Sequence, residues 1–183
     1  MIYRMISKEP LLDDDYLYQQ DDELALNALV ENNFSRSKII VCGVSHADAL
    51  KELDFIQAPS GVFLLSKKFL DLILDEIGVV PFDQAIFEND RGEDVLDQCF
   101  YQVLLNHFPG EYEYVDPIKY WPKFKKFKNF DFVIKEKSNH DVGIWVGRED
   151  EIPHYFLCSE SFMQLCVDKK INTDFQALPT LDC

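Results

Sequence analysis

The sequence is poor in glycine, with 7 glycines among 183 residues. None of them forms a G-x-G-x-x-G or G-x-x-x-x-G-K-[ST] pattern, in which backbone N–H groups cradle phosphates. The sequence therefore gives no indication of a nucleotide-binding loop.

Cysteine patterns that build disulfide frameworks or zinc sites are also absent. The cysteines are odd in number, widely spaced and without a C-x-x-C: Cys42, Cys99, Cys158, Cys166 and Cys183. No window approaches the roughly 20 apolar residues that span a bilayer. The start, MIYRMISKEP, lacks the apolar core of a signal peptide. We expect a cytoplasmic protein that carries no metal or other cofactor and does not enter a membrane.

Basic residues are scarce, with 18 Lys and Arg against 33 Asp and Glu, and the formal net charge is -15. Such a field repels phosphate backbones and anionic lipid, so we expect no nucleic-acid partner. It attracts basic partners instead. Hydrophobic residues make up 47% of the chain and aromatic residues 14%, which is enough apolar material for a packed core. The length suits one domain over residues 1–183.

The charges are unevenly distributed along the chain. Residues 9–31 hold eight acids and no Lys or Arg, and residues 83–116 hold nine acids and one base, Arg91. Residues 118–137 reverse the sign, with seven Lys against two acids. The lysines at 123–128 are interleaved with aromatic residues, which is typical of single-strand binding. In so acidic a chain a solvated basic rim is the better interpretation.

Short apolar runs predict several elements along the chain. We expect strands at 1–6, 38–44 and 99–105, although the last also suits a helix, and helices at 21–32 and 46–53. Two further strands at 130–135 and 142–147 are separated by a polar turn at 137–141, and this pattern is typical of a hairpin.

The most informative pattern is an internal repeat. An offset of 93 residues pairs Phe63 with Phe156, Ser66 with Ser159, and so on through residues 62–88 and 155–180. Each copy predicts a short apolar strand, a serine that caps a helix, an amphipathic helix and a second strand. Phe69 and Phe162 begin the buried stripes, which Leu72 and Ile73 continue in one copy and Leu165 and Cys166 in the other. We therefore predict an α+β fold with a mixed or antiparallel sheet and a strand-helix-strand pseudo-repeat.

Two residues are candidate nucleophiles. Ser45 in GVSHA follows an apolar strand, as in a nucleophile elbow, but the last glycine of that motif is missing. A helix N-cap is the better interpretation of Ser45. Cys158 follows His154 by four residues, too far along a strand for contact, and Cys158 corresponds to Leu65 in the repeat. The histidines have no metal-ligand spacing: His46, His107, His140 and His154.

The order of these segments is similar to a known family. PSGVFLLSKKFLDLIL, PFDQAIF, CFYQVLLN, GIWVG and PHYFLCSESFMQLC with DFQALP resemble the Imm11 family of immunity proteins over residues 55–180. In that family a strand-Ser-helix segment recurs near the C-terminus after a tryptophan-bearing strand. Here Trp145, Ser159 and Phe162 occupy those places. The acidic region 1–54 does not align.

This resemblance implies a non-enzymatic α+β protein that binds and neutralises a cognate bacterial toxin, such as a nuclease delivered by contact-dependent or type VI secretion. An acidic face suits the basic cleft of such a toxin. Two alternatives remain: a small enzyme that uses Ser45 or Cys158, and a binding module unrelated to toxins. Charge alone selects the expected toxin contacts: Asp13, Asp14, Asp15, Asp21, Asp22, Glu23, Asp90, Glu93, Asp94, Glu149, Asp150 and Glu151.

Overall fold

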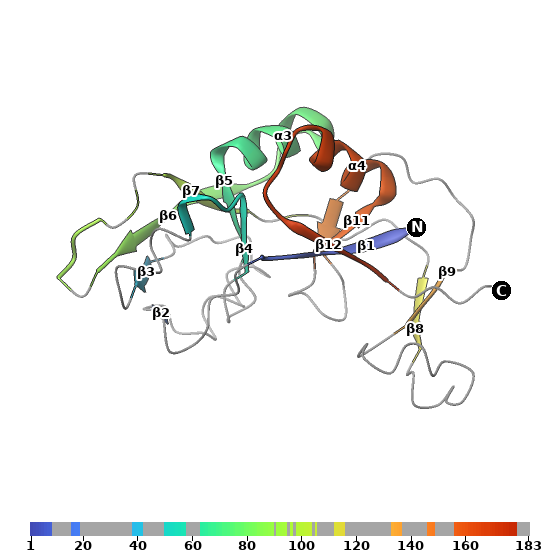
Figure 1. Ribbon diagram of the computed structural model, residues 1–183, viewed down its shortest axis with the longest axis horizontal. Helices are drawn as coiled ribbons and strands as arrows, with labels where there is room; N and C mark the ends of the chain where they lie inside the picture. The colour runs from blue at the N-terminus through green and yellow to red at the C-terminus, as the bar shows by residue number, and fades with distance from the viewer. Residues whose placement is uncertain are drawn as a thin grey trace.

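A computed structural model gives the structure of the chain. It describes residues 1–8, 16–18, 38–41, 50–57, 63–89, 91–94, 96, 98–103, 105, 112–115, 133–136, 146–148 and 156–178. In this part of the chain the two α-helices lie on the same side of the main strands (Figure 1). Neither helix is long and apolar enough to cross a membrane.

The first sheet is built around one copy of the repeat. Its strands lie in the order β2 (Tyr16–Tyr18), β3 (Lys38–Val41), β6 (Phe82–Glu88), β7 (Phe100–Val103), β5 (Phe63–Ser66) and β4 (Phe55–Gln57). The β3–β6 pair is parallel and the other pairs are antiparallel. Helix α3 (Lys67–Ile77) connects β5 to β6.

The second sheet contains the other copy. Its order is β10 (Val146–Arg148), β11 (Phe156–Ser159), β1 (Ile2–Ile6) and β12 (Asp174–Ala177), all antiparallel. Helix α4 (Glu160–Asp168) connects β11 to β12. Strands β8 (Tyr112–Val115) and β9 (Val133–Glu136) form a separate pair. The predicted α+β class, with mixed and antiparallel sheets, is confirmed.

Both helices begin at the predicted serine caps. The Ser66 hydroxyl accepts the backbone N–H of Phe69 at 3.2 Å, and the Ser159 hydroxyl accepts that of Phe162, also at 3.2 Å. Each bond satisfies a first-turn donor that has no partner within the helix. The predicted stripes are buried as well, except that Leu165 is only half-buried at the edge of the core.

The pseudo-repeat extends further than the sequence predicts. In the first sheet, Leu65 of β5 lies opposite Tyr101 of β7; in the second, the equivalent Cys158 lies opposite Tyr3 of β1. On its other edge β5 pairs with β4, and β11 pairs with β10. The residue register is the same in the two pairs. Four strands and a helix are therefore repeated. The N-terminal strand β1 completes the second copy, whereas β7 completes the first.

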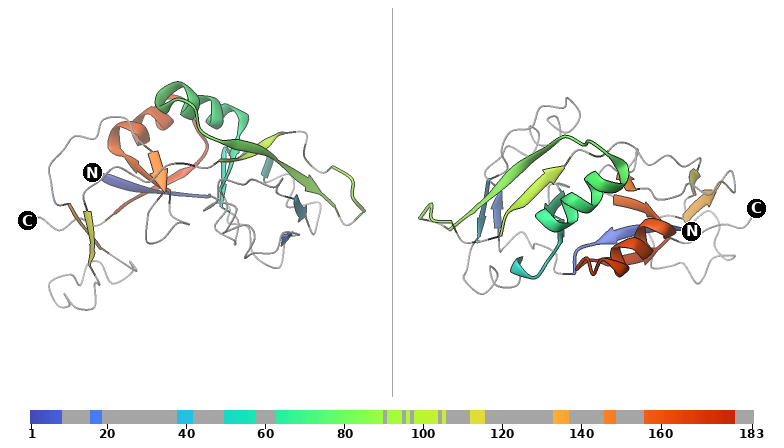
Figure 2. Two further views of the ribbon diagram at one scale, coloured as in Figure 1. Left: turned by 180° about the vertical axis from the view of Figure 1, so that it is seen from behind. Right: turned by 90° about the horizontal axis from the view of Figure 1, so that it is seen from above.

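The two copies pack against each other through equivalent side chains. The rings of Phe63 and Phe156 have centroids 4.3 Å apart, and those of Phe69 and Phe162 lie 6.2 Å apart. Contact between equivalent residues is the mark of a two-fold arrangement. The helices accordingly lie side by side (Figure 2). One hydrophobic cluster joins both copies and is the shared core of the described residues.

The remaining local predictions have mixed outcomes. The strands at 1–6 and 99–105 are confirmed as β1 and β7, and the first four residues of 38–44 form β3. The hairpin of 130–135 with 142–147 is wrong, because β9 pairs with β8 and β10 pairs with β11. Burial of Val146 in the shared core accounts for that choice. The helix predicted at 21–32 lies outside the described part, as do residues 46–49 of the helix predicted at 46–53, of which Leu50 and Lys51 are helical.

Candidate functional site

The structure describes the side chains of two of the twelve predicted toxin contacts, Glu93 and Asp94. Both are exposed in the turn after β6. The other predicted contacts lie outside the described residues: Asp13, Asp14, Asp15, Asp21, Asp22, Glu23, Asp90, Glu149, Asp150 and Glu151. Charge is the sequence signal that identified this turn.

Side-chain hydrogen bonds from Asn89 cross-link the described residues of the turn. Asn89 Oδ1 accepts the backbone N–H groups of Arg91 and Glu93, each at 2.9 Å. Asn89 Nδ2 donates to Glu93 Oε2 at 2.8 Å. Gly92 has a φ of +77°, a left-handed conformation that glycine adopts without steric cost. The backbone of Asp94 bridges back to Glu88, so three carboxylates are held at this end of the molecule.

A cavity of about 570 Å³ opens beside this turn. It is lined by residues 84–88 of β6 and by Asp94, Leu96, Gln98 and Cys99. The lining contains two carboxylates, two side-chain amides and a thiol, and its partly exposed apolar residues are Ile86 and Leu96. Among the lining residues that the structure describes, none is a Lys, Arg or His. Sequence reasoning missed the cavity because it forms only where β6 meets the chain leading into β7.

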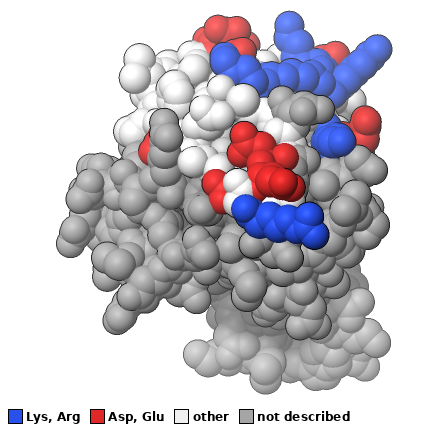
Figure 3. Space-filling model, turned by 90° about the vertical axis from the view of Figure 1, so that its left-hand side faces the viewer, with Lys and Arg blue, Asp and Glu red and all other residues white. Residues whose placement is uncertain are grey.

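Acidic side chains do not cover the whole described surface. In Figure 3, which looks onto the end that carries the turn, a central group of acidic side chains lies directly beside a basic one, and several basic side chains lie near the top of the view with acidic ones next to them. Lys68, in the first turn of α3, donates to the backbone oxygen of Lys170 beyond α4 at 2.5 Å. Lys67 and Lys169 are their exposed neighbours. The described surface at this end therefore carries both signs of charge.

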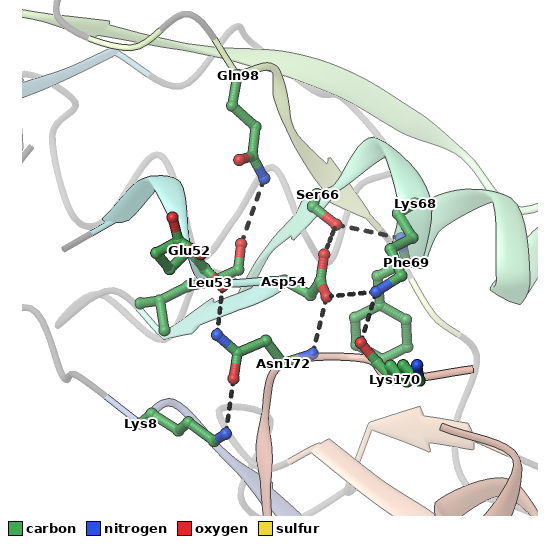
Figure 4. Close-up of polar contacts among 10 residues, drawn as sticks. All are labelled: Lys8, Glu52, Leu53, Asp54, Ser66, Lys68, Phe69, Gln98, Lys170 and Asn172. Atoms are coloured by element: carbon green, nitrogen blue, oxygen red, sulfur yellow. Dashed lines mark hydrogen bonds and ion pairs between the residues drawn. The ribbon is translucent and has the colours of Figure 1, made fainter. Parts of the chain in front are cut away.

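A buried carboxylate, which sequence reasoning also missed, links the two copies (Figure 4). Asp54 Oδ1 accepts from the Ser66 hydroxyl at 2.5 Å, and Oδ2 accepts from the backbone N–H of Asn172 at 2.7 Å. Lys68 Nζ lies 3.3 Å from the same Oδ2. Asn172 also accepts from Lys8 Nζ at 2.6 Å. Since Ser66 is 2% exposed and caps a helix, this cluster holds the copies together and offers no reactive hydroxyl.

The predicted candidate nucleophiles do not form a catalytic group among the described residues. Cys158 is fully buried, and burial, followed by the nearby Cys166, raises its pKa well above the usual value. A reactive cysteine needs the opposite shift. Ser45 and His154 lie outside the described residues. Within those residues, no group of three His, Cys, Asp or Glu side chains is placed to hold a metal ion.

Thiol accessibility gives a direct test of this placement. Cys99 is exposed, whereas burial raises the pKa of Cys166 to about 12. On the order of one Cys166 thiol in a thousand is ionised at pH 9. We expect iodoacetamide to modify Cys99 of the folded protein at least about 100-fold faster than Cys158 or Cys166. Peptide mapping by mass spectrometry measures the rates, and similar rates for all three would contradict the buried positions.

The end of the molecule around the turn therefore presents the carboxylates of Glu93 and Asp94 together with the exposed side chain of Arg91. Carboxylates of this kind bind basic side chains and do not by themselves supply a nucleophile or an oxyanion site. Comparisons with protein-family models, with curated proteins and with solved structures find no match to this chain.

Proposed function

We propose that this chain is a cytoplasmic immunity protein that binds a bacterial toxin and neutralises it by direct contact through an acidic surface. The observation that carries the proposal is the fixed turn after β6. It holds Glu93 and Asp94 exposed beside a cavity that is lined, among the described residues, by two carboxylates and two side-chain amides. The pattern resemblance of residues 55–180 to Imm11 immunity proteins supports the same function.

The acidic charge suits rapid capture of a basic target. A net charge of -15 attracts a basic nuclease from a distance. Charged side chains that hydrogen bonds hold in place then set the orientation in which the two proteins bind. Asn89 fixes the Glu93 carboxylate by a direct hydrogen bond. Carboxylates held in this way occupy the basic substrate cleft of the toxin and exclude its substrate.

The proposal is tested with the product of the adjacent gene as the binding partner. We expect a one-to-one complex whose association rate falls steeply as salt is raised. Neutralising the turn with Glu93→Gln and Asp94→Asn should lower the association rate about tenfold at low salt. Stopped-flow fluorescence measures these rates.

The matched control removes the same charge elsewhere. Asp75 and Glu76 are exposed on α3, so the Asp75→Asn and Glu76→Gln pair changes net charge equally. We expect this pair to slow association less than twofold. An association rate insensitive to salt and equal in both double variants would contradict binding through the acidic turn.

A further inference from the structure

We draw no further inference here: the strongest candidate, the apolar surface patch that Val79 and Phe82 expose where the chain passes from α3 into β6, carries nothing, because nothing in the described part of the structure shows what covers it.

Discussion

Replacing Phe162 with alanine is expected to lower the free energy of unfolding by about 4 kcal/mol. The side chain is fully buried, begins the buried stripe of α4 and stacks on Phe69 of the other copy. Alanine would leave a cavity between the two helices, where both copies share one core. Urea unfolding followed by tryptophan fluorescence measures the loss.

A surface variant and a double variant complete this experiment. Val167 lies on the same helix but is 53% exposed, so Val167→Ala should cost less than about 0.5 kcal/mol. Combining Phe69→Ala with Phe162→Ala should give a coupling of about 1 kcal/mol between the rings. A loss below about 1 kcal/mol for Phe162→Ala would contradict the packing of equivalent residues at the centre of the fold.

Replacing Asp54 with alanine is expected to cost about 3 kcal/mol. The substitution removes the acceptor of the Ser66 hydroxyl and of the Asn172 backbone N–H. Both groups lie where the first copy meets the turn after α4, so their loss also loosens the contact between copies. The nearby ion pair adds little, because Lys68 is half exposed and solvent screens its charge. Thermal and urea unfolding measure the change.

An exposed carboxylate on α3 serves as the comparison. Asp71 pairs with Lys67 one turn along this helix, with both side chains at least half exposed. Asp71→Ala should therefore cost no more than about 0.5 kcal/mol. Asp54→Asn keeps an acceptor for one of the two donors and should fall between the two alanine variants. Equal losses for Asp54→Ala and Asp71→Ala would show that the buried cluster does not stabilise the fold.

Local features of the fold are predictable from sequence. Ser66 and Ser159 each stand between an apolar strand and an amphipathic run, and capping by the serine hydroxyl favours the start of a helix at that point. The same aromatic residue three positions later begins each buried stripe. These signals are local in the chain, and the structure confirms them.

Strand partners are not predictable in the same way. Tyr3 and Tyr101 occupy equivalent places in the two sheets. In the chain, however, Tyr3 comes before the strand-helix segment of its copy, whereas Tyr101 comes after the strand-helix segment of the other copy. No single offset aligns them together with the helices. The failed hairpin has the same origin, because a polar turn brings two strands close along the chain but burial of Val146 decides which strand β10 joins.

Some features of the candidate site are predictable from the sequence alone, and others depend on tertiary contacts. Net charge identified Glu93 and Asp94, because charge is a property that each residue carries alone. The cavity cannot be read from the sequence, since it depends on tertiary contacts such as those of Gln84 with Cys99 and of Gln98 with Leu53. Asp54 was missed for that reason too, as its partners come from α3 and from the turn after α4.

Co-expression with the adjacent gene product is the measurement that tests the immunity function most directly. Growth of cells that produce this product is compared with and without the full-length protein, and with the Phe162→Ala variant as a destabilised control. We expect the folded protein to restore growth and to co-purify with the product in a one-to-one complex. Unrestored growth together with no complex, at equal expression of the two proteins, would contradict the immunity function.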